Sequence, residues 1–172
     1  NDGSSNLDII LDFMENKSNY SIINWDENRG PGYAKYKMVE HVQQSNYGHN
    51  DIMIIIDGDD YLSTPKALTI INSRYIKTKC WVTCGNYSGK WSENIKQCTN
   101  KYIENEGRRK EKNWYFPPIR TCKIELMHHI NKDIFTFEGE YIRKSTDTML
   151  FVNILELCSP RQIQFISDSL YV

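Results

Sequence analysis

The chain has 172 residues, of which 40% are hydrophobic and 25% are charged, so it can bury one ordinary core, and we predict a single globular domain over residues 1–172. A formal net charge of -1 gives no general attraction to nucleic acid or to acidic membranes, and we expect no nucleic-acid partner. The sequence contains no stretch that is long and apolar enough to span a bilayer, and no visible signal peptide.

The first half of the chain alternates between helical and strand-like patterns. In chain order, hydrophobic spacing predicts a helix over 7–14, a strand over 21–25, a helix over 33–45, a strand over 51–56, a helix over 65–75 and a strand over 80–87. This alternation predicts an α/β fold with a mostly parallel sheet flanked by helices.

The second half begins with a polar segment. Residues 88–114 are rich in charged residues, Gly and Asn, and we predict a mobile loop there. Two helices over 124–130 and 146–157 and a strand over 162–166 complete the pattern.

The cysteines favour neither a disulfide framework nor a zinc ribbon. Their number is odd and they form no CxxC pair, so we expect reduced thiols. They are Cys80, Cys84, Cys98, Cys122 and Cys158.

Three carboxylates follow the strongest predicted strand, in the stretch Asp57-Gly58-Asp59-Asp60. Ligands of parallel α/β sheets gather at the carboxyl ends of the strands. Crowded carboxylates repel one another, whereas a hard divalent cation that prefers oxygen ligands makes their closeness favourable. The stretch therefore favours a metal-diphosphate site, and the plainer interpretation is a solvated Asp-rich turn.

Four short motifs occur in one order along the chain: NDGSS at 1–5, NRGPGYAK at 28–35, DGDD at 57–60 and STD at 145–147. Together they resemble the inverting family 2 glycosyltransferases of the GT-A fold. That family has a D-D-G-S-type turn after its first strand, an N-x-G-x-x-x-A-R/K segment that begins a helix, a D-x-D-D loop and a catalytic carboxylate at the head of a helix. The resemblance implies a GT-A sheet whose first strand precedes Asn1.

The resemblance implies a nucleotide-sugar site. Asp2 would accept the imide N–H of a uracil, which favours a UDP-sugar donor, and Gly3 would allow close approach to the base. Lys35 would place positive charge near the nucleotide, and Asp57 would contact the ribose or a metal-bound water. Asp2 as a turn residue and Lys35 as a solvated helix residue are the alternatives.

Metal binding and catalysis would depend on two other carboxylates. Asp59 would bind the divalent cation, Mn²⁺ or Mg²⁺, that neutralises the departing diphosphate, while Asp60 supports the loop. Asp147 would be the general base that takes the proton from the acceptor hydroxyl, with inversion at the anomeric carbon. The alternative role of Asp147 is to cap a helix together with Ser145 and Thr146.

The sequence also departs from the family. Asn1 stands where the family has the first Asp of its base-binding pair, and no Q-x-x-R-W motif occurs, so we expect transfer of one sugar rather than processive synthesis. The acceptor would be a carbohydrate, a lipid-linked molecule or a protein. Membrane association would come from segments outside this chain, with the cytosolic face favoured and a secretory lumen as the alternative.

Some further side chains are candidates for the site. His128 or His129 could add a metal ligand, although a surface or packing role is favoured. Trp114 and Tyr115 could stack on a sugar ring, and Arg120 could face the acceptor or the diphosphate.

Three other functions are alternatives to glycosyl transfer. A calcium-binding EF-hand is excluded, because Leu62 occupies the sixth position from Asp57, where Gly is needed, and Leu68 the twelfth, where Glu is needed. A nucleotidyltransferase and an inactive transferase-like scaffold stay open.

Overall fold

The computed structural model describes residues 7–15, 17, 20–87, 92–104 and 116–172. Its α-helices are α1 (Leu7–Met14), α2 (Gly30–Gln44), α3 (Ala67–Thr78), α4 (Ser92–Glu104), α5 (Ile124–Met127) and α6 (Thr146–Glu156). Short 3₁₀ helices are η2 (Lys132–Phe135) and η3 (Pro160–Gln162). The strands are β1 (Ile52–Ile55), β2 (Val82–Tyr87), β3 (Arg120–Lys123), β4 (Thr136–Phe137), β5 (Glu140–Tyr141) and β6 (Ile163–Tyr171).

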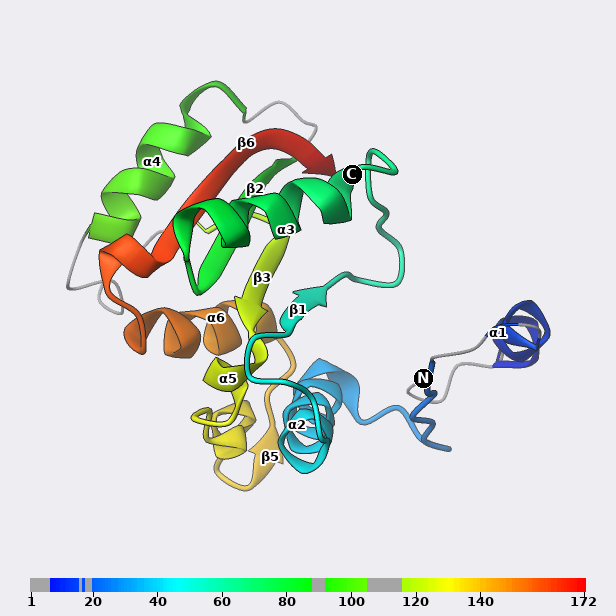
Figure 1. The fold of residues 1–172 in the computed structure, drawn as a ribbon. Helices are drawn as coiled ribbons and strands as arrows, with labels where there is room; N and C mark the ends of the chain where they lie inside the picture. Colours follow the sequence, from blue (N-terminus) through cyan, green and yellow to red (C-terminus); the bar gives the residue numbers. More distant parts are fainter. Residues whose placement is uncertain (1–6, 16, 18–19, 88–91, 105–115) are drawn as a thin grey trace.

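The main sheet has the strand order β1-β3-β2-β6 (Figure 1). Strand β3 runs antiparallel to both β1 and β2, and among the strands of the described residues only β2 and β6 are parallel. The α/β class is confirmed, but the prediction of a mostly parallel sheet is wrong. The physical reason is that the alternation of helices and strands specifies neither the order nor the direction of strands that pair across long sequence separations, and β3 lies between β1 and β2 although it follows both.

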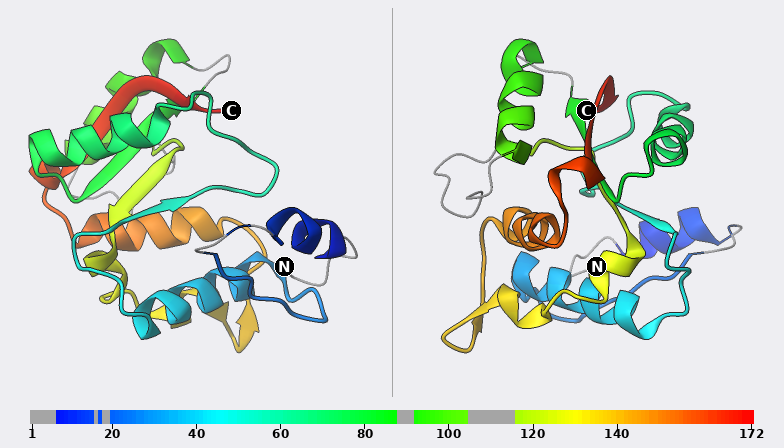
Figure 2. Two further views of the ribbon diagram at one scale, coloured as in Figure 1. Left: turned by 45° about the vertical axis from the view of Figure 1, so that its right-hand side comes forward. Right: turned by 60° about the vertical axis from the view of Figure 1, so that its left-hand side comes forward.

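Helices cover both faces of this sheet. The right-hand view of Figure 2 shows α3 on one side of the strands and α4 with α6 on the other. One apolar cluster joins α3 to β6 through residues such as Ile71, Ile166 and Leu170, and the larger cluster joins α2, α4, α5 and α6 to the other face. Successive side chains of a strand point to opposite faces of the sheet, so neighbouring residues such as Ile54 and Ile55 belong to different clusters.

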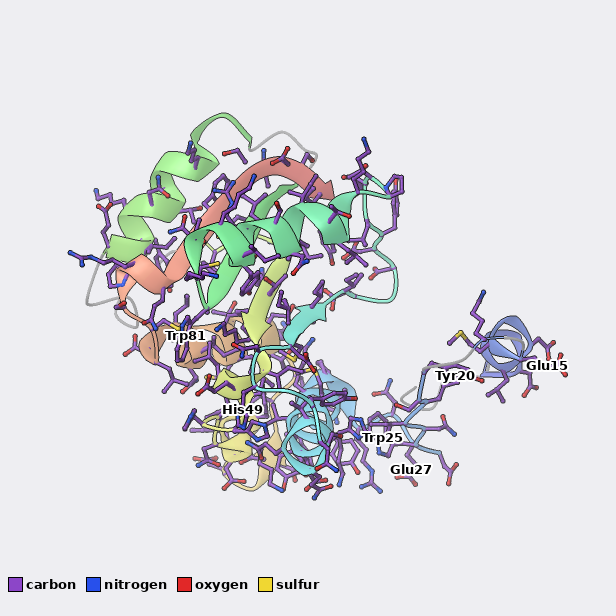
Figure 3. The ribbon with its side chains drawn as sticks, viewed as in Figure 1. Glu15, Tyr20, Trp25, Glu27, His49 and Trp81 are labelled. Atoms are coloured by element: carbon purple, nitrogen blue, oxygen red, sulfur yellow. The ribbon has the colours of Figure 1, made fainter. Side chains whose placement is uncertain are left out.

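Three boundaries differ from the sequence-based expectations. Residues 21–25 form no regular strand, and Trp25 instead places its ring 5.1 Å from that of Tyr33 at the start of α2 (Figure 3). Strand β6 extends five residues further than predicted, to Tyr171. The short strand β3 was not predicted at all.

The predicted loop over 88–114 contains helix α4 at its centre. This part of the prediction is wrong, because Thr99, Tyr102 and Ile103 bury one face of α4 although the helix is polar overall. Residues 88–91 and 105–114 lie outside the described residues.

The chain after β1 is attached to the end of β6. Tyr61 and Val172 exchange backbone hydrogen bonds of 3.1 Å in both directions, and Ser63 N–H donates to the Leu170 carbonyl at 3.1 Å. Figure 1 shows the C-terminal end of β6 beside this segment. The acidic stretch 57–60 is therefore placed between β1 and the last strand.

All five cysteines are free, as the sequence analysis expected. In the described part of the chain, no helix combines the length and the hydropathy needed to cross a membrane.

Candidate functional site

The centre of the candidate site is the Asp147 carboxylate, which is ion-paired on both oxygens. Lys35 Nζ lies 2.9 Å from Oδ1, and Arg120 Nη1 lies 3.4 Å from Oδ2. The Asp147 side chain is 30% exposed, while the two cations are 14% and 17% exposed. A carboxylate that can reach solvent is thus held from two sides by cations that are nearly buried.

Helix α6 supplies Asp147 in its first turn. A carboxylate is favoured there, because the unsatisfied N–H groups of a helix start carry positive partial charge. Ser145 directly precedes the first residue of α6, and its backbone is left-handed, with φ of 57°. This conformation costs a non-glycine residue of the order of 1 kcal/mol. This turn directs the chain from β5 into α6 and so sets where Asp147 lies.

Helix α2 supplies Lys35, and its start is fitted closely to the segment that leads to α6. Gly32 N–H donates to the Ile142 carbonyl at 3.1 Å. A Cβ atom at Gly32 would lie 2.3 Å from that oxygen, so no other residue fits without a shift. Gly30 has φ of 80° and donates its N–H to the Asn28 side chain. The glycines of the NRGPGYAK motif therefore serve the approach of α2 to this segment.

Strand β3 supplies Arg120, whose guanidinium is held by more than Asp147. Its Nε donates to the Phe116 carbonyl at 2.8 Å, and its Cζ lies 5.9 Å from the centre of the Phe151 ring. Burial lowers the pKa of Arg120, and the nearby Asp147 and Asp57 carboxylates oppose that shift. Because arginine is still charged at neutral pH, it supplies a fixed positive charge to the site.

The acidic stretch forms a tight turn at the end of β1. Asp60 N–H donates to the Asp57 carbonyl at 3.1 Å, and Gly58 has open space around its Cα. The Asp60 carboxylate accepts a 2.6 Å hydrogen bond from the Tyr171 hydroxyl. Asp59 is exposed, and among the described residues its carboxylate has no hydrogen-bond or ion-pair partner. In this turn the Asp60 carboxylate is therefore hydrogen-bonded, while the Asp59 carboxylate is exposed to solvent.

Two cavities meet at Asp57 and Asp147. The larger, of about 560 Å³, lies between the start of α2 and the acidic turn, and Lys35 and Gly58 also line it. The smaller, of about 120 Å³, is also lined by Asp60, Arg120 and Tyr171. A binding site with carboxylates and cations facing the same space suits a polar, charged ligand with a bound cation.

The structure brings together four of the residues singled out from the sequence. Lys35, Asp57 and Asp147 line the same cavity, and Asp59 belongs to the turn that borders it. Asp2, Gly3, Trp114 and Tyr115 lie outside the described residues.

The histidine pair lies away from this centre. His128 and His129 are exposed, and the His128 ring is 6.0 Å from that of His49. Within the described residues, no group of three or more His, Cys, Asp or Glu side chains could hold a metal ion alone. The predicted surface role for the histidines is consistent with this placement.

Tyr171 was not predicted from the sequence, and Arg120 was predicted only to face the acceptor or the diphosphate. Tyr171 lies more than a hundred positions after the acidic turn and belongs to no motif, so only the pairing of β6 with 61–63 reveals it.

Comparison with known protein families, with curated proteins and with solved structures finds no match to this chain.

Proposed function

We propose that this chain is a metal-dependent inverting glycosyltransferase domain of the GT-A type that moves one sugar from a UDP-sugar to an acceptor hydroxyl. One observation carries the proposal: Asp57 of the acidic turn and Asp147 of α6, far apart in sequence, line the same two adjoining cavities. These are the residues that the motifs assign to the nucleotide side and to the catalytic side of such a site.

The acidic turn fits a cation that is shared with a nucleotide. Mg²⁺-like ions usually bind through one or two carboxylates, several waters and the phosphates of the substrate, so a three-residue protein cage is not required. Asp59 is exposed and lies two residues from Asp57, which faces the larger cavity. Asp59 would hold the cation, which when bound offsets negative charge on the departing diphosphate, and Asp57 would contact the ribose or a metal-bound water.

Asp147 would act as the general base. Its two oxygens retain lone pairs beyond those used by Lys35 and Arg120, so one oxygen can accept the proton of an acceptor hydroxyl. That hydroxyl oxygen forms a bond to the anomeric carbon as the bond from this carbon to the diphosphate oxygen breaks. The diphosphate leaves with the bonding electrons, and attack from the opposite face inverts the configuration.

Lys35 and Arg120 would hold Asp147 in place, and their positive charge would complement the negative diphosphate of the UDP-sugar. Arg120 is fixed by the Phe116 carbonyl and the Phe151 ring, so it restricts where the Asp147 carboxylate can move. Lys35 lines the larger cavity together with Asp57 and Gly58, where its charge would attract a diphosphate.

The test is calorimetric titration of UDP into the folded protein with and without MnCl₂. We expect binding that requires manganese and that is lost in Asp59→Ala. The matched control is Asp168→Ala, which removes an exposed carboxylate on β6 and is expected to bind as wild type does. Absence of manganese-dependent UDP binding by folded wild-type protein would remove the uridine-diphosphate site.

Product analysis separates this reaction from the alternatives. Incubation with UDP-sugars and acceptors should release UDP, whereas release of pyrophosphate from UTP in the presence of a sugar phosphate would indicate nucleotidyl transfer. Binding of UDP without turnover by the intact protein would indicate a scaffold.

A further inference from the structure

The Tyr171 hydroxyl contacts the acidic turn at two points. It donates to Asp60 Oδ2 at 2.6 Å and accepts from the Asp57 backbone N–H at 3.4 Å. The tyrosine is only 6% exposed and lines the smaller cavity together with Asp57 and Asp60. One side chain from the last strand thus contacts both ends of the 57–60 turn.

The backbone around Tyr171 is fixed independently of the hydroxyl. Tyr171 pairs with Leu62 across an antiparallel bridge, and hydrogen bonds between Tyr61 and Val172 flank this bridge. Its ring belongs to the apolar cluster under α3. The hydroxyl therefore projects from a rigid base, which is the condition for holding a loop in one geometry.

We propose that Tyr171 is a positioning residue that reserves Asp60 for loop support and orients the turn so that Asp57 and Asp59 are presented to the divalent cation and the nucleotide. The inference rests on the proposed function. Three carboxylates within four residues repel one another, and a neutral donor on one of them leaves the other two for the cation and the nucleotide. The bond to the Asp57 N–H fixes the first residue of the turn relative to β6.

The chain offers a matched control for this inference. Ser63 lies on the same segment and its hydroxyl donates to the Ser169 carbonyl of β6, yet it contacts none of the acidic side chains. Tyr171→Phe and Ser63→Ala each remove one hydroxyl that joins the segment after β1 to β6. Only Tyr171→Phe also removes a hydrogen bond to an acidic side chain of the turn.

The experiment measures Mn²⁺ affinity by electron paramagnetic resonance and UDP affinity in the presence of manganese. We expect Tyr171→Phe to weaken Mn²⁺-dependent UDP binding about tenfold, as loss of a charge-assisted hydrogen bond does. The UDP affinity of Ser63→Ala in the presence of manganese should stay within about twofold of that of wild type, because surface substitutions usually have effects of this size. Circular dichroism and urea unfolding establish that both variants are folded.

A double-mutant cycle with Asp60→Asn gives the decisive readout. If Tyr171 acts through Asp60, Tyr171→Phe should weaken binding little further once Asp60→Asn is present, because contacting residues are not additive. Additive losses, or equal losses in Tyr171→Phe and Ser63→Ala, would overturn the positioning role. Wild-type affinity in Tyr171→Phe would overturn it while the proposed function stands, whereas no manganese-dependent binding by wild type would overturn both.

Discussion

Asp147 combines two requirements that usually conflict, firm placement and access to a substrate. Lys35 and Arg120 hold its oxygens, yet almost a third of the side chain is exposed beside two cavities. A general base needs both properties, because it must meet a hydroxyl in one orientation and still exchange its proton.

The first prediction concerns Asp147→Asn. The amide keeps the shape of the side chain but cannot accept the proton, so we expect kcat to fall by about 10²- to 10⁴-fold. Manganese-dependent UDP binding should change by no more than a few-fold, because the substitution leaves the acidic turn intact. Steady-state assay and calorimetry measure the two effects, with Asp168→Asn as the exposed control. A variant that keeps wild-type kcat would show that another group is the base.

Sequence alone indicated part of this site. Asp57, Asp59 and Asp147 stand out because carboxylates directly follow a strand or open a helix, and both contexts are local. The ion pair from Lys35 to Asp147 and the contact of Tyr171 with Asp60 are not local, since they depend on how α2 and β6 approach β1. The motifs indicate candidate residues, but only the tertiary fold shows which carboxylates form ion pairs or hydrogen bonds and which residues are their partners.

At the scale of elements, the approach of α2 to the segment before α6 sets the distance between Lys35 and Asp147. We predict that Gly32→Ala destabilises the protein by about 1 to 3 kcal/mol, because its Cβ would meet the Ile142 backbone oxygen at 2.3 Å. An alanine inside a helix normally stabilises it, so a loss would point to this contact. UDP binding should weaken as well, since Lys35 follows one turn later.

The control for this prediction is Gly58→Ala. A Cβ atom there meets nothing within 4 Å, so unfolding free energy should change by less than about 0.5 kcal/mol. Urea unfolding of both variants makes the comparison. Equal stability of Gly32→Ala and wild type would mean that α2 lies further from Ile142 than the structure has it.

A second element contact predicts how stability depends on pH. Glu40 of α2 is ion-paired with Lys132 of η2 at 2.6 Å and with Lys37 of its own helix, and these partners lower the pKa of Glu40 from 4.5 to about 2. A carboxylate with a depressed pKa in the folded state stabilises the protein above its unfolded pKa. That contribution is lost as pH falls from about 4.5 towards 2.

The measurement is the urea midpoint of wild type and Glu40→Gln between pH 6 and pH 2.5. We expect the wild-type midpoint to fall more steeply than that of the variant below about pH 4.5, where Glu40 begins to protonate in the unfolded chain. High salt should reduce the difference, because the pair is at the surface. Parallel curves for the two proteins would contradict the ion pairs at Glu40.

The elements that sequence predicted well are those with strong local patterns. Strand β1 is a continuous apolar run, and α6 combines helical spacing with a polar start. Strand β3 has only the residues Arg120-Thr121-Cys122-Lys123, too short for a periodicity. Its place in the sheet is fixed by tertiary contacts, including a buried hydroxyl chain in which Thr121 bonds to both Tyr75 and Thr83.

At the scale of the whole molecule, the two apolar clusters bury nearly all of the thiols. Cys80, Cys84 and Cys122 are fully buried and Cys158 is 5% exposed, while Cys98 is partly exposed. Burial raises the pKa of Cys80, Cys84 and Cys122, which suppresses the reactive thiolate.

We therefore predict that one thiol of five reacts quickly with a disulfide reagent in the native protein and that all five react in denaturant. Absorbance of the released thiolate counts them, and Cys98→Ser should remove the fast phase. Two or more fast native thiols would mean that the clusters on the sheet are less closed than described.

Strand β1 lies at one end of the sheet, and in the described part of the chain it pairs only with β3. It is apolar along its length, and Ile56 just beyond it is 41% exposed. An apolar strand with an unpaired row of backbone groups is a template for a strand from another molecule. A second molecule that paired with β1 would do so in a concentration-dependent way, so we expect binding constants to be comparable only between samples of the same protein concentration.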